Sequence, residues 1–479
     1  MQASRSVHFP VAQGYGSQNW NWWFVGFRMT LCLFCATVFS PCRRAVAQDS
    51  FDLAPIFYSA SESQDPVAQL QRRLQAGQTV LDKDPEHGLL PSLLKELRIP
   101  LESQVLVFSK TSLQIHKISP TNPRAIYFND SVYVGYVPGS TILELAANDP
   151  KLGAVFYTFD TAIQSDTTQT NGSSANGPSS NEASSNEASS NEASSGLVRD
   201  RGQCLSCHAT TRTENVPGYL VRSIYSDRAG RPRTGSSSFT TDYRSPFQSR
   251  WGGWYVTGTH GSMRHLGNLF AVDRTDPQKV DFESGANQLQ LPSRVAPGLH
   301  PQPYSDLVAL MVLEHQIRVH NLITKANFET RQAIAMDESM NKALGRDPQY
   351  RSESTERRIQ SVANHLADAL LMHGEPPLEG AVSGTSNFAA VFPSTGPRDQ
   401  QGRSLRDLDL KTRLFRFPLS YLIYTQEFQQ LPSDVMKLIR AKLATELDLP
   451  ERQAEREILN ETLPGFLSGK PSTNALDNP

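Results

Sequence analysis

The chain has 479 residues, of which 38% are hydrophobic and 20% charged, enough for a packed core and for about two or three domains. Its formal net charge is −2. Residues 1–47 hold four arginines and no acidic residue, so the rest of the chain has 42 basic and 48 acidic side chains and a net charge of −6. This balance does not suggest nucleic-acid binding, so we expect no nucleic-acid partner.

The N-terminus has the order of a targeting segment. Basic residues precede the apolar run Met29–Ser40, and positions 45–47 carry the small residues that a signal peptidase reads. We therefore expect residues 1–47 to be a signal peptide and the rest of the chain to be periplasmic or otherwise exported. The alternative is an uncleaved membrane anchor over 22–40, and only in that case do we expect contact with a membrane.

Residues 48–164 have the pattern of a mixed α/β region with a small sheet. Runs rich in Val, Ile, Tyr and Phe are separated by Pro, Asn and Gly, which is typical of short strands. The expected helices are Val67–Leu74 and Leu93–Leu97, and the expected strands are Gln104–Phe108, Ala125–Phe128, Val132–Val137 and Ala154–Phe159.

Residues 165–196 are of low complexity. The five-residue unit Asn-Glu-Ala-Ser-Ser occurs three times without a break from Asn181 onward. A tract of Ser, Asn and Gly cannot bury enough apolar surface to fold, so we expect a disordered linker or surface loop.

The remainder divides into a loop-rich segment, 197–300, and a helical region, 301–470. Expected helices of the helical region are Ser305–Arg331, Glu353–His373, Ser433–Leu447 and Arg452–Glu461. The sequence therefore predicts an α+β protein with a small strand-containing N-terminal region, a loop-rich middle and a mainly α-helical C-terminal half.

The loop-rich segment carries the motif Cys-x-x-Cys-His at 204–208, the attachment motif of a c-type haem. Each thiol adds to one haem vinyl group, and two intervening residues let both sulfurs reach their vinyls. The next residue then lies beneath the iron, where an imidazole can bind it. We expect one covalent haem c on Cys204 and Cys207, with His208 as the proximal iron ligand.

Other interpretations of the cysteine pair remain. Cys-x-x-Cys also occurs in thioredoxin-like redox sites and as half of a zinc site, and a short motif can match by chance. Three of the five cysteines, Cys32, Cys35 and Cys42, lie in the expected signal peptide. The exported chain then has no second Cys-x-x-Cys to complete a four-cysteine zinc site, which favours haem.

The second axial position of the iron decides the chemistry. A sixth ligand from His or Met favours electron transfer, whereas an open position permits substrate chemistry. A glycine-bounded loop offers His260, Met263 and His265, and His315 falls on the apolar stripe of the expected helix 305–331. Any of these histidines could also be an ordinary core residue. His265 and then His315 are the distal candidates that we rank first.

The five-residue motif resembles the haem site of c-type cytochromes. Two longer phrases, Arg250–His260 and Gly402–Phe415, look like those of large, uncharacterised exported monohaem cytochrome-c-like bacterial proteins, a resemblance that spans about residues 100–465. It implies haem attachment after export but brings no known reaction. The chain departs from small cytochromes, whose motif lies near the start, and from dihaem peroxidases, because it has one such motif.

We therefore expect an exported c-type haem protein with one covalently bound haem, acting in electron transfer. The alternative is a haem-dependent oxidoreductase, peroxidase-like or a small-molecule oxidase, with an open or weakly filled sixth iron position. The length of the chain favours an enzyme and the single haem motif weakens the peroxidase version, so both stay open. The expected partner is a redox protein or a small-molecule electron donor or acceptor.

Overall fold

The computed structural model describes residues 50–163, 196–232, 238–271 and 279–469. The expected signal peptide, and the expected linker apart from its last residue, lie outside these ranges. The described residues belong to one compact unit that begins at Gln48. Helices and antiparallel sheets together make it an α+β protein. Within the described ranges, no helix is both long enough and apolar enough to cross a lipid bilayer.

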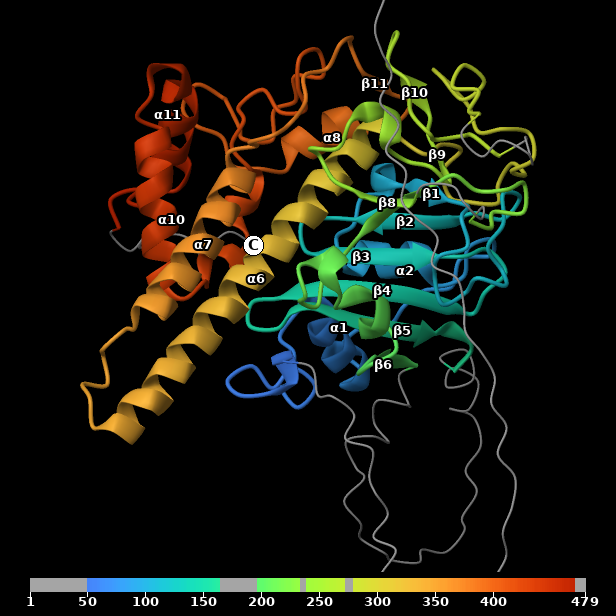
Figure 1. Ribbon diagram of the computed structural model, residues 1–479. Coiled ribbons are helices and arrows are strands. Elements are labelled where there is room, and N and C mark those ends of the chain that lie inside the picture. Colours follow the sequence, from blue (N-terminus) through green and yellow to red (C-terminus); the bar gives the residue numbers. More distant parts are fainter. Residues whose placement is uncertain (1–49, 164–195, 233–237, 272–278, 470–479) are drawn as a thin grey trace, which may run out of the picture. The chain divides into compact units, whose positions relative to one another are not determined.

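A seven-stranded antiparallel sheet in the order β6-β5-β4-β3-β2-β1-β9 is the central layer (Figure 1). Two of its strands, β6 and β9, follow the low-complexity tract in sequence, so the sheet is larger than the small N-terminal sheet that the sequence suggested. Its strands are β1 (Val105–Val107), β2 (Arg124–Phe128), β3 (Val132–Tyr136), β4 (Ile142–Asp149), β5 (Gly153–Asp160), β6 (Leu197–Arg199) and β9 (Trp254–Tyr255).

Strand β4 was not expected from the sequence. Its residues include Leu, Glu and Ala, which favour helices when they stand alone. In the structure all eight residues of β4 pair with β5, from Ile142 opposite Asp160 to Asp149 opposite Gly153. This pairing outweighs local propensity, as is common in the centre of a sheet.

The two faces of the sheet meet different layers. Successive strand residues point to opposite faces, so Phe156 and Tyr157 of β5 face different layers. The hydroxyl of Tyr157 donates a hydrogen bond to Asp65, which caps the N-terminus of α1 (Pro66–Gln75). Helix α1 therefore packs on the Tyr157 face. The opposite face, on which Phe156 lies, is called the Phe156 face below.

Helix α6 (Leu307–Leu344) begins at the sheet and runs past Arg331, where the expected helix ended. Its N-cap, Asp306, accepts hydrogen bonds from the backbone N–H groups of Val308 and Ala309, and Gly345 ends it in the left-handed conformation. It packs against α7 (Glu353–Leu370). The other helices are α2 (Leu90–Glu96), α5 (Leu205–His208), α8 (Phe388–Ser394), α9 (Gln426–Gln429), α10 (Ser433–Glu446) and α11 (Gln453–Thr462).

Two small sheets complete the fold. Strand β7 (Val221–Ile224) pairs with β8 (Ser238–Thr241), and β10 (Gly258–Thr259) pairs with β11 (Ser383–Gly384). The second pair joins two distant parts of the chain, because β10 belongs to residues 197–300 and β11 to residues 301–470.

The β4–β5 hairpin touches α6 at Gly153, whose φ is +68°. A Cβ atom at Gly153 would lie 2.2 Å from Cγ2 of Thr324 on α6. We expect Gly153→Ala to lower the free energy of unfolding by about 3 kcal/mol or more, from backbone strain plus overpacking. Urea denaturation measures this change.

The matched control is Gly139→Ala in the β3–β4 hairpin. Gly139 has a similar φ of +74°, but no atom lies within 4 Å of a Cβ placed there. Strain alone then costs about 1–2 kcal/mol. Equal losses in the two variants would show that the contact with Thr324 adds nothing.

Candidate functional site

The cysteine motif lies on a single helical turn, α5, that follows strand β6. Asp200 Oδ1 accepts a hydrogen bond of 2.9 Å from the backbone N–H of Cys204, and the N–H of His208 donates to the carbonyl oxygen of Cys204 at 3.0 Å. Both cysteines are free; Cys204 is half-buried and Cys207 is exposed. The turn thus presents the two thiols and the imidazole within one short segment.

The ring of His208 is oriented by the loop that follows it. Its Nδ1 lies 2.9 Å from the carbonyl oxygen of Gly218, so Nδ1 carries the hydrogen and donates it. The N–H of Gly218 donates back to the carbonyl oxygen of His208 at 2.8 Å. Among the described residues, none forms a hydrogen bond with the other ring nitrogen, Nε2, whose lone pair can bind a metal ion.

Helix α6 holds this loop in place through Asn321. The Oδ1 atom of Asn321 accepts from the N–H of Tyr219, and its Nδ2 donates to the carbonyl oxygen of Tyr219, both at 2.8 Å. A Cβ atom at Gly218 would lie 2.4 Å from Oδ1 of Asn321, so only glycine fits there. Asn321 therefore acts on the imidazole of His208 through the backbone of Gly218 and Tyr219.

The imidazole of His208 packs on the Phe156 face of the sheet. The rings of His208 and Phe156 lie 4.8 Å apart, and the ring of Tyr219 lies 6.1 Å from that of Phe156. Burial is the main cause that lowers the pKa of His208, and the positive charge of Arg124 adds to it. A neutral imidazole is therefore favoured near neutral pH, which is the form that binds metals.

Two charged residues that the sequence analysis did not single out lie on the same face. Arg124 Nη1 and Glu144 Oε2 form an ion pair at 2.7 Å, and both side chains are less than one-fifth exposed. Ser112 Oγ and Gln114 Nε2 donate to Glu144 Oε1 at 3.2 and 3.1 Å. Leu143 and Leu145 flank Glu144, which is the alternation of a strand and was the available signal in the sequence. The helix-favouring residues of this stretch obscured that signal.

The thiol of Cys204 has an environment unlike that of a redox-active dithiol. Burial and the nearby carboxylate of Asp200 raise its pKa to about 12. Reactive thiols in thioredoxin-like sites have lowered pKa values. Among the described residues, no group of three or more His, Cys, Asp or Glu side chains could hold a metal ion. The raised pKa of Cys204 therefore gives the thioredoxin-like interpretation no support.

The two distal candidates lie in aromatic clusters. His265 is buried beside His260 and Trp251, with ring centroids 4.7 and 5.3 Å away. His315 is buried between Tyr243 and Phe415, and its Nε2 lies 2.8 Å from Ser420 Oγ. Burial lowers the pKa of each to about 3. The groups around His208 come instead from the sheet and the 209–219 loop, so a distal role for either histidine stays a prediction.

A buried polar network lies where α6 crosses the Phe156 face. Gln316 Nε2 donates to the hydroxyl of Tyr133 at 2.8 Å, and this hydroxyl lies 2.9 Å from Nδ1 of His320. The hydroxyl of Tyr219 donates to Asn148 Oδ1 at 2.9 Å, and Asn148 Nδ2 lies 3.0 Å from the same Nδ1. These bonds tie the sheet, α6 and the loop after the motif into one structure.

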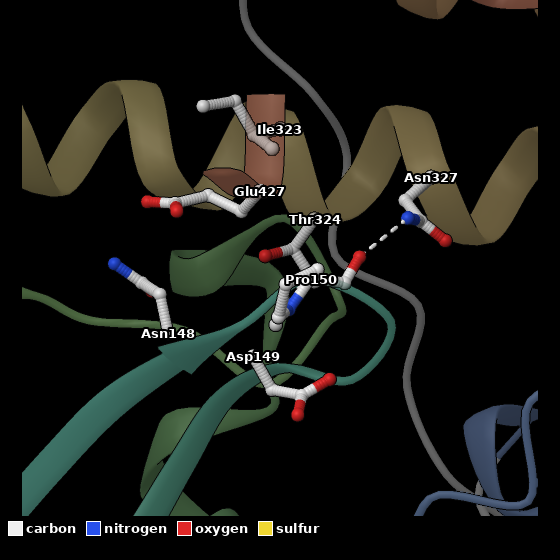
Figure 2. A pocket seen from close by; sticks show the side chains of 8 residues that line it. Asn148, Asp149, Pro150, Ile323, Thr324, Asn327 and Glu427 are labelled. Atoms are coloured by element: carbon white, nitrogen blue, oxygen red, sulfur yellow. Dashed lines mark hydrogen bonds between the residues drawn. The ribbon is translucent and has the colours of Figure 1, made fainter. Parts of the chain in front are cut away.

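Glu427 of α9 lies at the edge of this network and also lines a pocket. Its Oε1 lies 3.3 Å from Nε2 of His320, and burial raises its pKa to about 8. The pocket is formed by the β4–β5 hairpin and α6, and Figure 2 shows the carboxyl group of Glu427 and the amide of Asn148 on the same side of it. Asn327 Nδ2 donates to the carbonyl oxygen of Pro150 at the other end.

Comparison with known proteins identifies no relative. No family model, no curated protein and no solved structure matches the chain.

We expect Asn321→Ala to lower the free energy of unfolding by about 2–4 kcal/mol, because two buried backbone groups of Tyr219 lose their partners. Urea denaturation measures the loss. The control is Asn364→Ala on α7, where the side chain accepts one exposed hydrogen bond from Gln360; its cost should stay near 0.5 kcal/mol. Similar losses in both variants would contradict the role assigned to Asn321.

Glu427 should make stability depend on pH. Because its folded pKa of about 8 lies above the ordinary 4.5, the folded state binds more protons than the unfolded state between these values. The free energy of unfolding contributed by this group therefore falls as the pH rises from 5 to 8.

We expect Glu427→Gln to remove this contribution. Relative to the parent protein, the variant should gain at least about 1 kcal/mol of stability between pH 5 and pH 8. Urea denaturation at several pH values measures the difference, with Glu338→Gln at an exposed position of α6 as the control. A constant difference across this pH range would refute the assignment.

Proposed function

We propose that this chain is an exported c-type haem protein that carries one covalent haem on Cys204 and Cys207, with His208 as the proximal iron ligand, and that it acts in electron transfer. The observation that carries the proposal is the arrangement of α5. It combines two free, accessible thiols with an imidazole whose Nδ1 is bound to a backbone carbonyl oxygen and whose Nε2 is free.

The residues present fit a covalent haem. Cys207 is exposed and Cys204 is half-buried, so both sulfurs can be reached by a large planar group. The bond to Gly218 sets the tautomer of His208 and makes Nε2 the donor atom. Two small residues of the Phe156 face, Gly135 and Ala146, lie on the same side of the sheet as the imidazole.

A bound haem supplies reversible one-electron chemistry at its iron, and the chain tunes it. Asn321 and Gly218 hold the imidazole in one orientation, and the neutral form of His208 keeps its lone pair available. The exposure of Cys207 places the cysteine edge of the site at the surface, where a redox protein or a small electron donor or acceptor can approach. Helix α6 holds the loop after the motif through Asn321, and α7 packs against α6.

In this proposal the regions of the chain have separate tasks. The strand-containing N-terminal region provides the face on which the imidazole packs, and the loop-rich segment carries the motif. The mainly α-helical C-terminal half positions the motif through Asn321. The expected export of the chain agrees with a covalent haem, because c-type haem is attached after translocation in the cytochromes that the motif resembles.

The Arg124–Glu144 pair favours a second candidate function, a haem-dependent oxidoreductase. A carboxylate and a guanidinium beside the iron could move protons and hold a small substrate if the sixth position were open. The occupancy of the sixth position decides between the two functions.

The covalent attachment is tested by expressing the full chain with export and haem maturation. A denaturing gel stained for haem should show a band for the parent protein and none for the double variant Cys204→Ala/Cys207→Ala, since no thioether can form. Ser206→Ala, an exposed change between the two cysteines, is the control and should keep the stain. Haem stain retained in the double variant would contradict the proposal.

A further inference from the structure

The Phe156 face has one covered half and one partly exposed half. Beside α6 its residues are buried, among them Tyr133, Ala146 and Phe156. Toward the β3–β4 hairpin the same face carries residues that are only partly buried: Arg124, Ile126, Ile142, Glu144 and Thr158. Strand register places them together, because Glu144 lies opposite both Gly135 and Thr158, and Gly135 lies opposite Ile126.

The imidazole of His208 lies beside the partly exposed half, because it packs on Phe156, and the next residue of β5 on the same face is Thr158, opposite Glu144. Nδ1 is bound to Gly218, and the next residue, Tyr219, is tied to Asn321 of α6 and to Asn148. The Nδ1 side of the ring therefore faces α6. Nε2 lies on the other side of the ring from Nδ1, and Arg124 and Glu144 are the charged groups that act on His208.

The segment 112–117 lies at the far end of this exposed half. Ser112 and Gln114 donate to Glu144, and Gln114 Nε2 also reaches the carbonyl oxygen of Ile142 at 3.3 Å. Lys117 Nζ donates to the carbonyl oxygen of Gly139 in the β3–β4 hairpin. The segment is thus anchored on the side of Glu144 that lies away from α6.

This segment exposes apolar side chains together with an imidazole. Leu113 is 44% and Ile115 is 39% exposed, and the next residue, His116, is also exposed. No hydrogen bond or ring contact ties the side chain of His116 to the described part of the chain. These two apolar side chains could pack on a haem bound at the cysteine motif, because the haem ring is mostly apolar.

We propose that His116 is the sixth ligand of the haem iron, and that the 112–117 segment covers the face of the haem opposite His208. The inference rests on the proposed covalent haem and deepens it. With His208 on one side and His116 on the other, the iron has two imidazole ligands and no free position, which suits electron transfer and not substrate binding.

Arg124 and Glu144 then have a positioning role. Glu144 accepts hydrogen bonds from Ser112 and Gln114, and Arg124 holds the carboxylate in place. The Arg124–Glu144 ion pair thereby holds the 112–117 segment, which carries His116, in place.

The test uses the exported, haem-loaded full chain and its variant His116→Ala. Low-temperature electron paramagnetic resonance and near-infrared magnetic circular dichroism report the iron ligands, and carbon monoxide added to the reduced protein reports an open position. The control is His365→Ala, which removes an exposed histidine from α7. His265→Ala and His315→Ala test the two buried candidates in the same way.

The parent protein and His365→Ala should show a low-spin iron with two imidazole ligands and no binding of carbon monoxide. His116→Ala should become high-spin and bind carbon monoxide stoichiometrically, and added imidazole should restore the low-spin signal. The proposal is overturned if His116→Ala keeps the parental spectrum, or if the parent protein is five-coordinate or has a methionine ligand. If the parent protein shows no covalent haem on the stained gel, the proposed function itself is wrong.

Discussion

The hydrogen bond between His208 Nδ1 and the carbonyl oxygen of Gly218 is the interaction on which the site depends. It sets the tautomer of the imidazole and decides in which direction the second nitrogen points. The carbonyl group is itself fixed, because the adjoining residue, Tyr219, is bound on both its N–H and its C=O by Asn321 of α6. A helix that starts about one hundred residues later in the chain thereby orients a side chain of the cysteine motif.

The buried network around His320 explains why this arrangement can be rigid. Tyr133 from β3, Asn148 from β4, Tyr219 from the loop and Gln316 from α6 exchange hydrogen bonds around one imidazole. Burying so many polar groups is tolerated only when nearly all are paired, and a network of this kind specifies one relative position of its elements. The sheet, the loop and α6 therefore cannot shift independently of one another.

Sequence patterns predicted six of the α-helices and four of the strands that the described residues form. Helices at 67–74, 353–373 and 433–447 and strands at 125–128 and 132–137 were placed within a few residues of their observed bounds. Helical phase also correctly placed His315 in the core. Strand β4 and the addition of β6 and β9 to the sheet were missed, because pairing between distant segments overrides local propensity there.

The sequence by itself determined which reactive groups the candidate site carries. The proposal of a covalent haem rests on Cys204, Cys207 and His208, whose type and spacing can be read from the sequence alone. Only the tertiary structure decided the surroundings. It set the direction of the His208 ring, the place of the Arg124–Glu144 pair and the aromatic neighbours of His265 and His315. These depend on contacts between residues far apart in the chain, which local patterns cannot encode.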